Sequence, residues 1–97
     1  MMIDKRNINL IQNYFKNQPV LKAFIFGSRA RNDAKFSSDL DILVELDYSK
    51  PIGLKFVKMQ LELQTLLQTK VDLVSSNGIS KYIQPFIEPE KMLIYEK

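Results

Sequence analysis

The residue types best suited to chemistry lie in two short segments near the middle of the chain. Gly27 and Ser28 follow the apolar run 24–26, and Asp39 and Asp41 open the next apolar run. A glycine-serine turn after a strand offers backbone amides and a hydroxyl to a phosphate group. A pair of carboxylates offers the oxygen ligands that a hard divalent cation prefers. Together the two segments predict a protein that handles a nucleoside triphosphate with a divalent metal.

The spacing of Asp39 and Asp41 places both side chains on one face of the expected strand 39–46, with Leu40 and Ile42 on the other face. Two ionised carboxylates side by side repel each other unless a cation or a proton lies between them. A divalent metal resolves this repulsion, and paired metal ions need such carboxylates around them. The pattern Asp-x-Asp is also common on exposed strands, so two solvated aspartates are the alternative.

A third carboxylate, Asp72, interrupts the otherwise apolar run 71–74. Aspartate is disfavoured in strands, and a buried aspartate costs free energy unless it is paired or ligates a cation. If this run forms a strand parallel to the strand 39–46, Asp72 lies near Asp41. The alternative role for Asp72 is an ion pair with a lysine such as Lys70.

The glycine-serine pair is a weak signal by itself, because most such pairs are ordinary turns. Glycine permits close approach of the backbone to a ligand and unusual backbone dihedral angles. The chain has no Gly-Lys-Ser/Thr sequence, so this turn is not a Walker loop. The short spacing between Gly27-Ser28 and the aspartate pair, with an apolar run beside each, makes the combined signal much stronger.

The composition excludes several kinds of active site. The 97 residues include no cysteine and no histidine. Disulfides, thiolate nucleophiles, a Ser-His-Asp triad and metal sites with cysteine or histidine ligands are therefore excluded. Ligand sets made only of oxygen suit magnesium or manganese. The length predicts one domain over residues 1–97.

The charge and hydropathy of the chain predict where it works. The net charge is +3, but the lysines are scattered without forming a stripe. This favours a solvated basic surface over direct nucleic-acid binding. No apolar run is long enough to span a membrane, and the N-terminus lacks a signal-peptide pattern. We therefore expect a cytoplasmic protein without membrane contacts.

Hydrophobic periodicity predicts an α+β fold with a small mixed sheet of about four strands and helices packed on it. The expected helices cover residues 3–16, 52–68 and 79–86, and the expected strands cover 21–26, 39–46, 70–74 and 92–95. The long helix between the second and third strands favours a parallel pair. A site shared by Gly27 and Asp39 requires the first two strands to be antiparallel.

The expected helix 52–68 carries two apolar faces. The broad face suits the core and comprises Phe56, Met59, Leu63, Leu66 and Leu67. A narrower stripe on the opposite side comprises Leu54, Val57 and Leu61. Loops or the C-terminal helix could cover this stripe, or a partner helix could dock on it, and the sequence leaves both alternatives open.

The segments 24–31 and 37–44 together resemble the signature of the nucleotidyltransferase superfamily of DNA polymerase beta. That signature is an apolar strand, Gly-Ser, a spacer, and Asp-x-Asp in a second strand. The segments look closest to the minimal nucleotidyltransferases, small domains that accompany HEPN-type toxins, and the closing segment 94–97 is also typical. One departure is Asn32, where many relatives have glycine. Asparagine tolerates left-handed dihedral angles better than other non-glycine residues.

The resemblance implies a role for each matching residue. Asp39 and Asp41 would bind two magnesium ions, or manganese in their place. Asp72 would bind the metal nearer the attacking hydroxyl and help to deprotonate that hydroxyl. Gly27 and Ser28 would hold the β and γ phosphates of ATP.

Two arginines follow the glycine-serine pair. Arg29 and Arg31 could neutralise phosphate charge, or they could be exposed arginines without such a role. The reaction implied by the resemblance is in-line attack on the α-phosphate with pyrophosphate leaving, driven mainly by positioning and metal electrostatics.

The family resemblance implies an antitoxin that transfers AMP from ATP to a tyrosine of a partner HEPN RNase toxin. The short chain predicts that the acceptor hydroxyl arrives on another protein. One rival is an antitoxin that acts by binding alone, with a metal site that is vestigial or structural. Another rival transfers a nucleotide to a small molecule. Polymerisation of nucleic acid fits less well, because the sequence shows no pattern of basic residues that would line a groove for nucleic acid.

Overall fold

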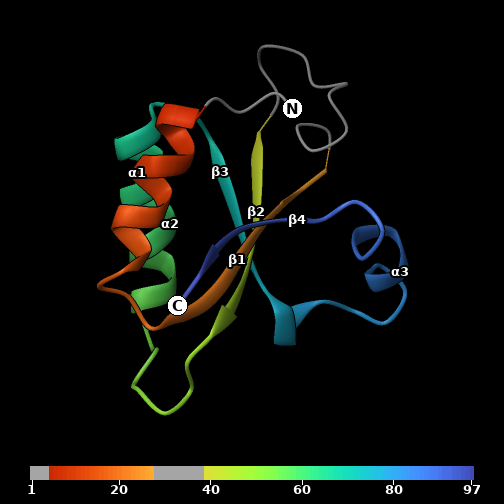
Figure 1. The fold of residues 1–97 in the computed structure, drawn as a ribbon. Coiled ribbons are helices and arrows are strands. Elements are labelled where there is room, and N and C mark those ends of the chain that lie inside the picture. The colour runs from red at the N-terminus through yellow and green to blue at the C-terminus, as the bar shows by residue number, and fades with distance from the viewer. Residues whose placement is uncertain (1–4, 28–38) are drawn as a thin grey trace.

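The structure is a computed structural model that describes residues 5–27 and 39–97 (Figure 1). In chain order the elements are α1 (Lys5–Phe15), β1 (Val20–Phe26), β2 (Leu40–Leu46), α2 (Lys55–Leu67), β3 (Val71–Ser75), the 3-10 helix η1 (Ser76–Gly78), α3 (Gln84–Ile87) and β4 (Met92–Glu96). These elements confirm the expected α+β class. Among the described helices, none has the length and apolar character that a membrane span requires.

The four strands form one mixed sheet in the order β3-β2-β1-β4. β1 runs antiparallel to both β2 and β4, while β2 and β3 are parallel. Both predicted relationships are therefore confirmed. Helices α1 and α2 cover one face of the sheet, and α3 lies on the other side (Figure 1). This topology brings the end of β1 and the starts of β2 and β3 to the same end of the sheet.

The main core lies between the sheet and the helices α1 and α2. Ile11 and Phe15 of α1 and Met59 and Leu63 of α2 are at most 1% exposed. Each such side chain contributes about 1.5–3 kcal/mol when it is fully buried. A smaller cluster on the opposite face of the sheet joins Phe24, Leu43 and Ile87. The second cluster attaches the α3 segment to the face that α1 and α2 leave open.

The edge strand β3 is protected by two side chains of α2. The side-chain oxygen of Gln64 accepts a hydrogen bond from the Val71 N–H at 3.1 Å, and that of Gln60 accepts one from the Leu73 N–H at 3.1 Å. These two N–H groups face away from β2 and would otherwise be unpaired at the edge of the sheet. The two contacts hold β3 against α2. Because Val71 and Leu73 flank Asp72, they also fix the position of Asp72 along the strand direction.

Two helices begin later than the sequence pattern predicts. α2 begins at Lys55, not at residue 52, because Gly53 has φ of +45°, which a right-handed helix cannot include. α3 covers only Gln84–Ile87, whereas the expected helix covered 79–86. Pro85 explains this difference, because proline lacks an N–H and is tolerated only in the first turn of a helix.

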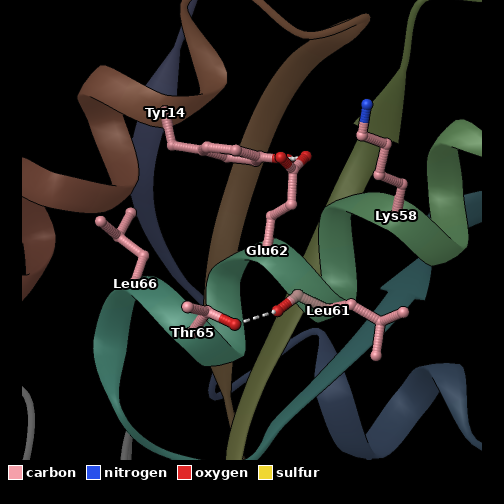
Figure 2. Close-up of a pocket in the computed structure, with 6 residues that line it drawn as sticks. All are labelled: Tyr14, Lys58, Leu61, Glu62, Thr65 and Leu66. Carbon is pink, nitrogen blue, oxygen red and sulfur yellow. Dashed lines mark hydrogen bonds between the residues drawn. The ribbon is translucent and has the colours of Figure 1, made fainter.

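The outward stripe of α2 is exposed. Leu54, Val57 and Leu61 are 86%, 55% and 55% exposed. No described loop or helix covers them, so the covered alternative is wrong and docking of a partner stays a prediction. Leu66 was expected in the core but is 39% exposed. It instead lines an open groove of about 450 Å³ between Tyr14 of α1 and the outer face of α2 (Figure 2).

Candidate active site

Gly27 follows the last residue of β1 in a conformation that favours glycine. Its φ is +78°, in the left-handed region. A Cβ atom placed on Gly27 would overlap Oδ2 of Asp41 and lie 3.2 Å from its Cγ. The missing side chain therefore lets the Asp41 carboxylate rest against the backbone of the turn. The structure therefore brings Gly27, the first residue of the predicted turn, against Asp41 of the predicted Asp-x-Asp pair.

Strands β2 and β3 place Asp41 and Asp72 beside each other. The two residues are direct partners in the parallel register. The Leu40 N–H donates a hydrogen bond of 2.9 Å to the Lys70 carbonyl and fixes this register. Both aspartates alternate with core residues, so both project from the face opposite α1 and α2. The expected proximity of Asp72 to Asp41 is confirmed, and Asp39 lies two residues before Asp41 at the start of β2.

The side chain of Asp72 is exposed, which corrects the premise that it is buried in an apolar strand. β3 is the edge of the sheet, and α2 covers only its other face. Within the described part of the chain, Asp72 makes no ion pair with Lys70, so the structural alternative for this residue is not borne out. Asp72 is therefore a candidate site residue because of its position opposite Asp41, not because of burial.

The predicted carboxylates do not form a preassembled metal cage. Within residues 5–27 and 39–97, no group of three or more His, Cys, Asp or Glu side chains is arranged to hold a metal ion. Asp39 and Asp41 are both partly exposed. The predicted phosphate-binding residues Ser28, Arg29 and Arg31, together with Asn32, lie outside the described residues.

A further carboxylate, Glu90, reaches the same turn and was missed by sequence reasoning. Its Oε1 accepts a hydrogen bond of 2.9 Å from the Gly27 N–H, across 63 residues of sequence. Glu90 lies between α3 and β4, in a polar stretch with no periodic pattern. No local signal marks such a residue, because the contact depends on how β4 pairs with β1.

Known proteins share both the sequence pattern and the fold of this chain. Residues 9–97 match the protein family described as Polymerase beta, Nucleotidyltransferase. The chain belongs to this nucleotidyltransferase family. A relative from Methanocaldococcus jannaschii, provisionally named protein adenylyltransferase MJ0126, is 45% identical over 73 residues, which is 73% of this chain and 70% of the relative.

Solved structures share the nucleotidyltransferase fold. A crystal structure of a toxin-antitoxin with AMP-PNP covers 94% of this chain and 74% of that chain, with a TM-score of 0.79 and 19% identity. A structure of tri-AMPylated Shewanella oneidensis HEPN toxin in complex with MNT antitoxin covers 98% of this chain and 74% of that chain, with a TM-score of 0.74 and 18% identity. At these identities the likeness establishes the fold alone.

The candidate site of this nucleotidyltransferase therefore lies where β1 ends and β2 and β3 begin. The substrate class that follows from the nucleotidyltransferase family is a nucleotide. The described part of the site supplies a left-handed conformation at Gly27, Asp41 and Asp72 as partners in the parallel register, and Asp39 two residues before Asp41.

Proposed function

We propose that this nucleotidyltransferase transfers AMP from ATP to a tyrosine hydroxyl of a HEPN RNase toxin and thereby inactivates the toxin. The observation that carries the proposal is the register of Asp41 and Asp72, next to the left-handed turn at Gly27. The adenylyltransferase name of the Methanocaldococcus jannaschii relative supports AMP as the transferred group. The AMPylated HEPN toxin in the Shewanella oneidensis complex supports the acceptor.

The proposed reaction is an in-line displacement at the α-phosphorus of ATP. The acceptor oxygen forms a bond to the α-phosphorus while the bond to the bridging oxygen breaks, and pyrophosphate leaves with the electron pair. The hydroxyl proton passes to a carboxylate, for which Asp72 is the candidate. The turn at Gly27 and Ser28 positions the β and γ phosphates. Positioning of this kind contributes a large part of the rate in such reactions.

Asp39, Asp41 and Asp72 fit a divalent cation by their chemistry. All three supply carboxylate oxygens, which magnesium and manganese prefer. Asp41 and Asp72 are direct partners in the parallel register, so their negative charges repel each other, and a bound cation would relieve that repulsion. Magnesium, when bound, would neutralise charge on the phosphates. Arg29 and Arg31 are proposed to add positive charge to the same phosphates.

The experiment combines the purified chain, a HEPN toxin, magnesium and ATP labelled at the α-phosphate. We expect label on the toxin and loss of its RNase activity. The double variant Asp39→Asn with Asp41→Asn should transfer no label while it still binds the toxin. The matched control is Asp47→Asn, an aspartate at the opposite end of β2, which should leave transfer unchanged.

The same experiment separates the rival functions. If the double variant neutralises the toxin as well as the wild-type chain, the protein acts by binding and the proposal is wrong. If the toxin stays unlabelled while a small hydroxyl compound accepts the label, the acceptor class is wrong but nucleotidyl transfer stands.

A further inference from the structure

Glu90 contacts the turn of the proposed active site from a distant part of the chain. Its Oε1 lies 2.9 Å from the backbone nitrogen of Gly27, and the bond is partly buried. A hydrogen bond from an N–H to a carboxylate is stronger than one between neutral groups. Glu90 therefore constrains the first residue of the turn, although sequence reasoning gave it no role.

Gly27 is held from two directions. The Asp41 carboxylate lies against its Cα atom, and the Glu90 carboxylate binds its N–H. The first contact requires that Gly27 has no side chain, and the second orients the peptide group between residues 26 and 27. Because the N–H of Gly27 donates to Glu90, a nucleotide phosphate can bind that N–H only by displacing the carboxylate.

The segment that carries Glu90 is itself anchored on the sheet. Ile87 is 6% exposed and packs with Phe24 and Leu43. The Lys91 ammonium lies 4.4 Å from the centre of the Phe24 ring. The backbone N–H groups of Glu90 and Lys91 both donate to the Ile87 carbonyl, at 3.1 Å and 2.9 Å. The carboxylate of Glu90 is therefore presented to Gly27 from a fixed support.

We propose that Glu90 is a positioning residue, which holds Gly27 in its left-handed conformation and thereby places the phosphate-binding turn and the Asp41 carboxylate relative to each other. This inference rests on the proposed nucleotidyl transfer at this site. A carboxylate beside a triphosphate is unfavourable in itself. The hydrogen bond from the Gly27 N–H directs part of this negative charge toward a backbone donor.

The test uses the full chain with three substitutions at residue 90 and one control. Glu90→Ala removes the acceptor, and Glu90→Asp keeps the charge but shortens the reach. Glu90→Gln keeps an acceptor oxygen without the charge. Glu88→Ala is the control, because Glu88 lies on the same segment and pairs at 2.6 Å with Lys91 instead of with Gly27.

We expect Glu90→Ala and Glu90→Asp to raise the KM for ATP about tenfold, which is the loss of one charge-assisted hydrogen bond. Glu90→Gln should restore the KM to within about threefold of wild type, since an amide oxygen still accepts the bond. Glu88→Ala should leave the KM unchanged. A merely structural role would lower the melting temperature and the active fraction without moving the KM.

Amide hydrogen exchange at Gly27 provides a readout that does not depend on catalysis. Exchange should be about tenfold faster in Glu90→Ala than in wild type, and near wild type in Glu90→Gln. If no acceptor is ever labelled but exchange follows this order, the proposed function fails while the hydrogen bond stands. If Glu90→Ala fails to fold, Glu90→Asp and Glu90→Gln still compare a variant that loses the hydrogen bond to Gly27 with one that keeps it.

Three outcomes overturn the inference. A lower KM for ATP in both Glu90→Ala and Glu90→Gln would make Glu90 a competitor of the nucleotide for the turn. Equal damage in both variants, with a changed magnesium requirement, would make its charge a metal ligand. Unchanged exchange at Gly27 in Glu90→Ala would show that the bond does not constrain the turn.

Discussion

The carboxylate of Asp41 rests against the Cα atom of Gly27, in space that a side chain would fill at any other residue type. Gly27 also has φ of +78°, so two separate constraints favour glycine there. The first constraint concerns the position of a proposed metal-binding carboxylate, and the second concerns the backbone. The other glycines of the chain allow the two to be separated.

Gly27→Ala is expected to reduce stability modestly and activity strongly. The left-handed conformation costs an alanine about 1–2 kcal/mol. The overlapping Asp41 carboxylate is the end of a partly exposed, rotatable side chain, so it can move aside at little cost to folding. Its displacement should lower kcat/KM for nucleotidyl transfer about tenfold or more. Urea denaturation and labelled-ATP assays measure the two effects.

Two further glycines serve as controls for this substitution. Gly53 has φ of +45° and no neighbouring atom within 4 Å of the position that a Cβ atom would take, so Gly53→Ala should lose similar stability but no activity. Gly78 has open space and no positive φ, so Gly78→Ala should change unfolding free energy by less than about 0.5 kcal/mol. Equal activity loss in Gly53→Ala and Gly27→Ala would contradict the role of the Asp41 contact.

Asp72→Asn is expected to stabilise the metal-free protein. Asp72 and Asp41 are partners in parallel strands, and like charges directly opposite each other on a sheet cost up to about 1 kcal/mol. High salt should reduce the gain, because both side chains are accessible to solvent. Magnesium should raise the melting temperature of the wild-type chain and raise that of Asp72→Asn less.

Asp47→Asn provides a control in which loss of an aspartate charge should lower stability instead of raising it. Hydrogen bonds from the Ser49 side chain and backbone lower the pKa of Asp47 below its usual 3.8. Its ionised form therefore favours the folded state, and this contribution is lost as the pH falls through the lowered pKa. Removing the Asp47 charge should destabilise the chain at neutral pH. A loss of stability in metal-free Asp72→Asn would contradict the proposed repulsion.

The part of the site that could be predicted is the part specified by local pattern. The apolar runs in 39–46 and 70–74 indicated two strands, and the long helix between them favoured a parallel pair, in which Asp72 lies near Asp41. The antiparallel pairing of β1 and β2 followed from the requirement that Gly27 and Asp39 share a site. These features are determined within short stretches of sequence.

The parts that could not be predicted depend on distant contacts or on single residues that override a pattern. Glu90 reaches Gly27 only because β4 pairs with β1 across the length of the chain. Leu66 fits the apolar face of α2 by periodicity, but the position of α1 leaves it in an open groove. α2 and α3 begin later than the periodicity predicts because of Gly53 and Pro85. The backbone constraint at one residue outweighs the apolar pattern of its neighbours.

The two glutamine contacts at the edge of β3 predict that each substitution changes hydrogen exchange at a different amide. Gln64 accepts from the Val71 N–H and Gln60 accepts from the Leu73 N–H. Gln64→Ala should speed exchange at residue 71 alone, and Gln60→Ala should speed it at residue 73 alone. Each substitution should cost about 1 kcal/mol of unfolding free energy. Each variant controls for the other, and equal acceleration at both amides would indicate general loosening of β3 instead.

The contact between α1 and α2 predicts a pH dependence. The Tyr14 hydroxyl donates a hydrogen bond of 2.6 Å to Glu62 Oε1, beside the groove (Figure 2). Burial raises the pKa of Tyr14 above its usual 10.0, and the negatively charged Glu62 raises it further. The neutral hydroxyl therefore favours the folded state, so this contribution is complete below pH 10 and is lost as the pH rises toward the folded-state pKa.

Tyr14→Phe should cost about 1 kcal/mol at neutral pH, and the difference from wild type should shrink between about pH 10 and pH 12. Tyr82→Phe, at a side chain 87% exposed, should show neither effect, and a pH-independent difference for Tyr14→Phe would contradict the argument.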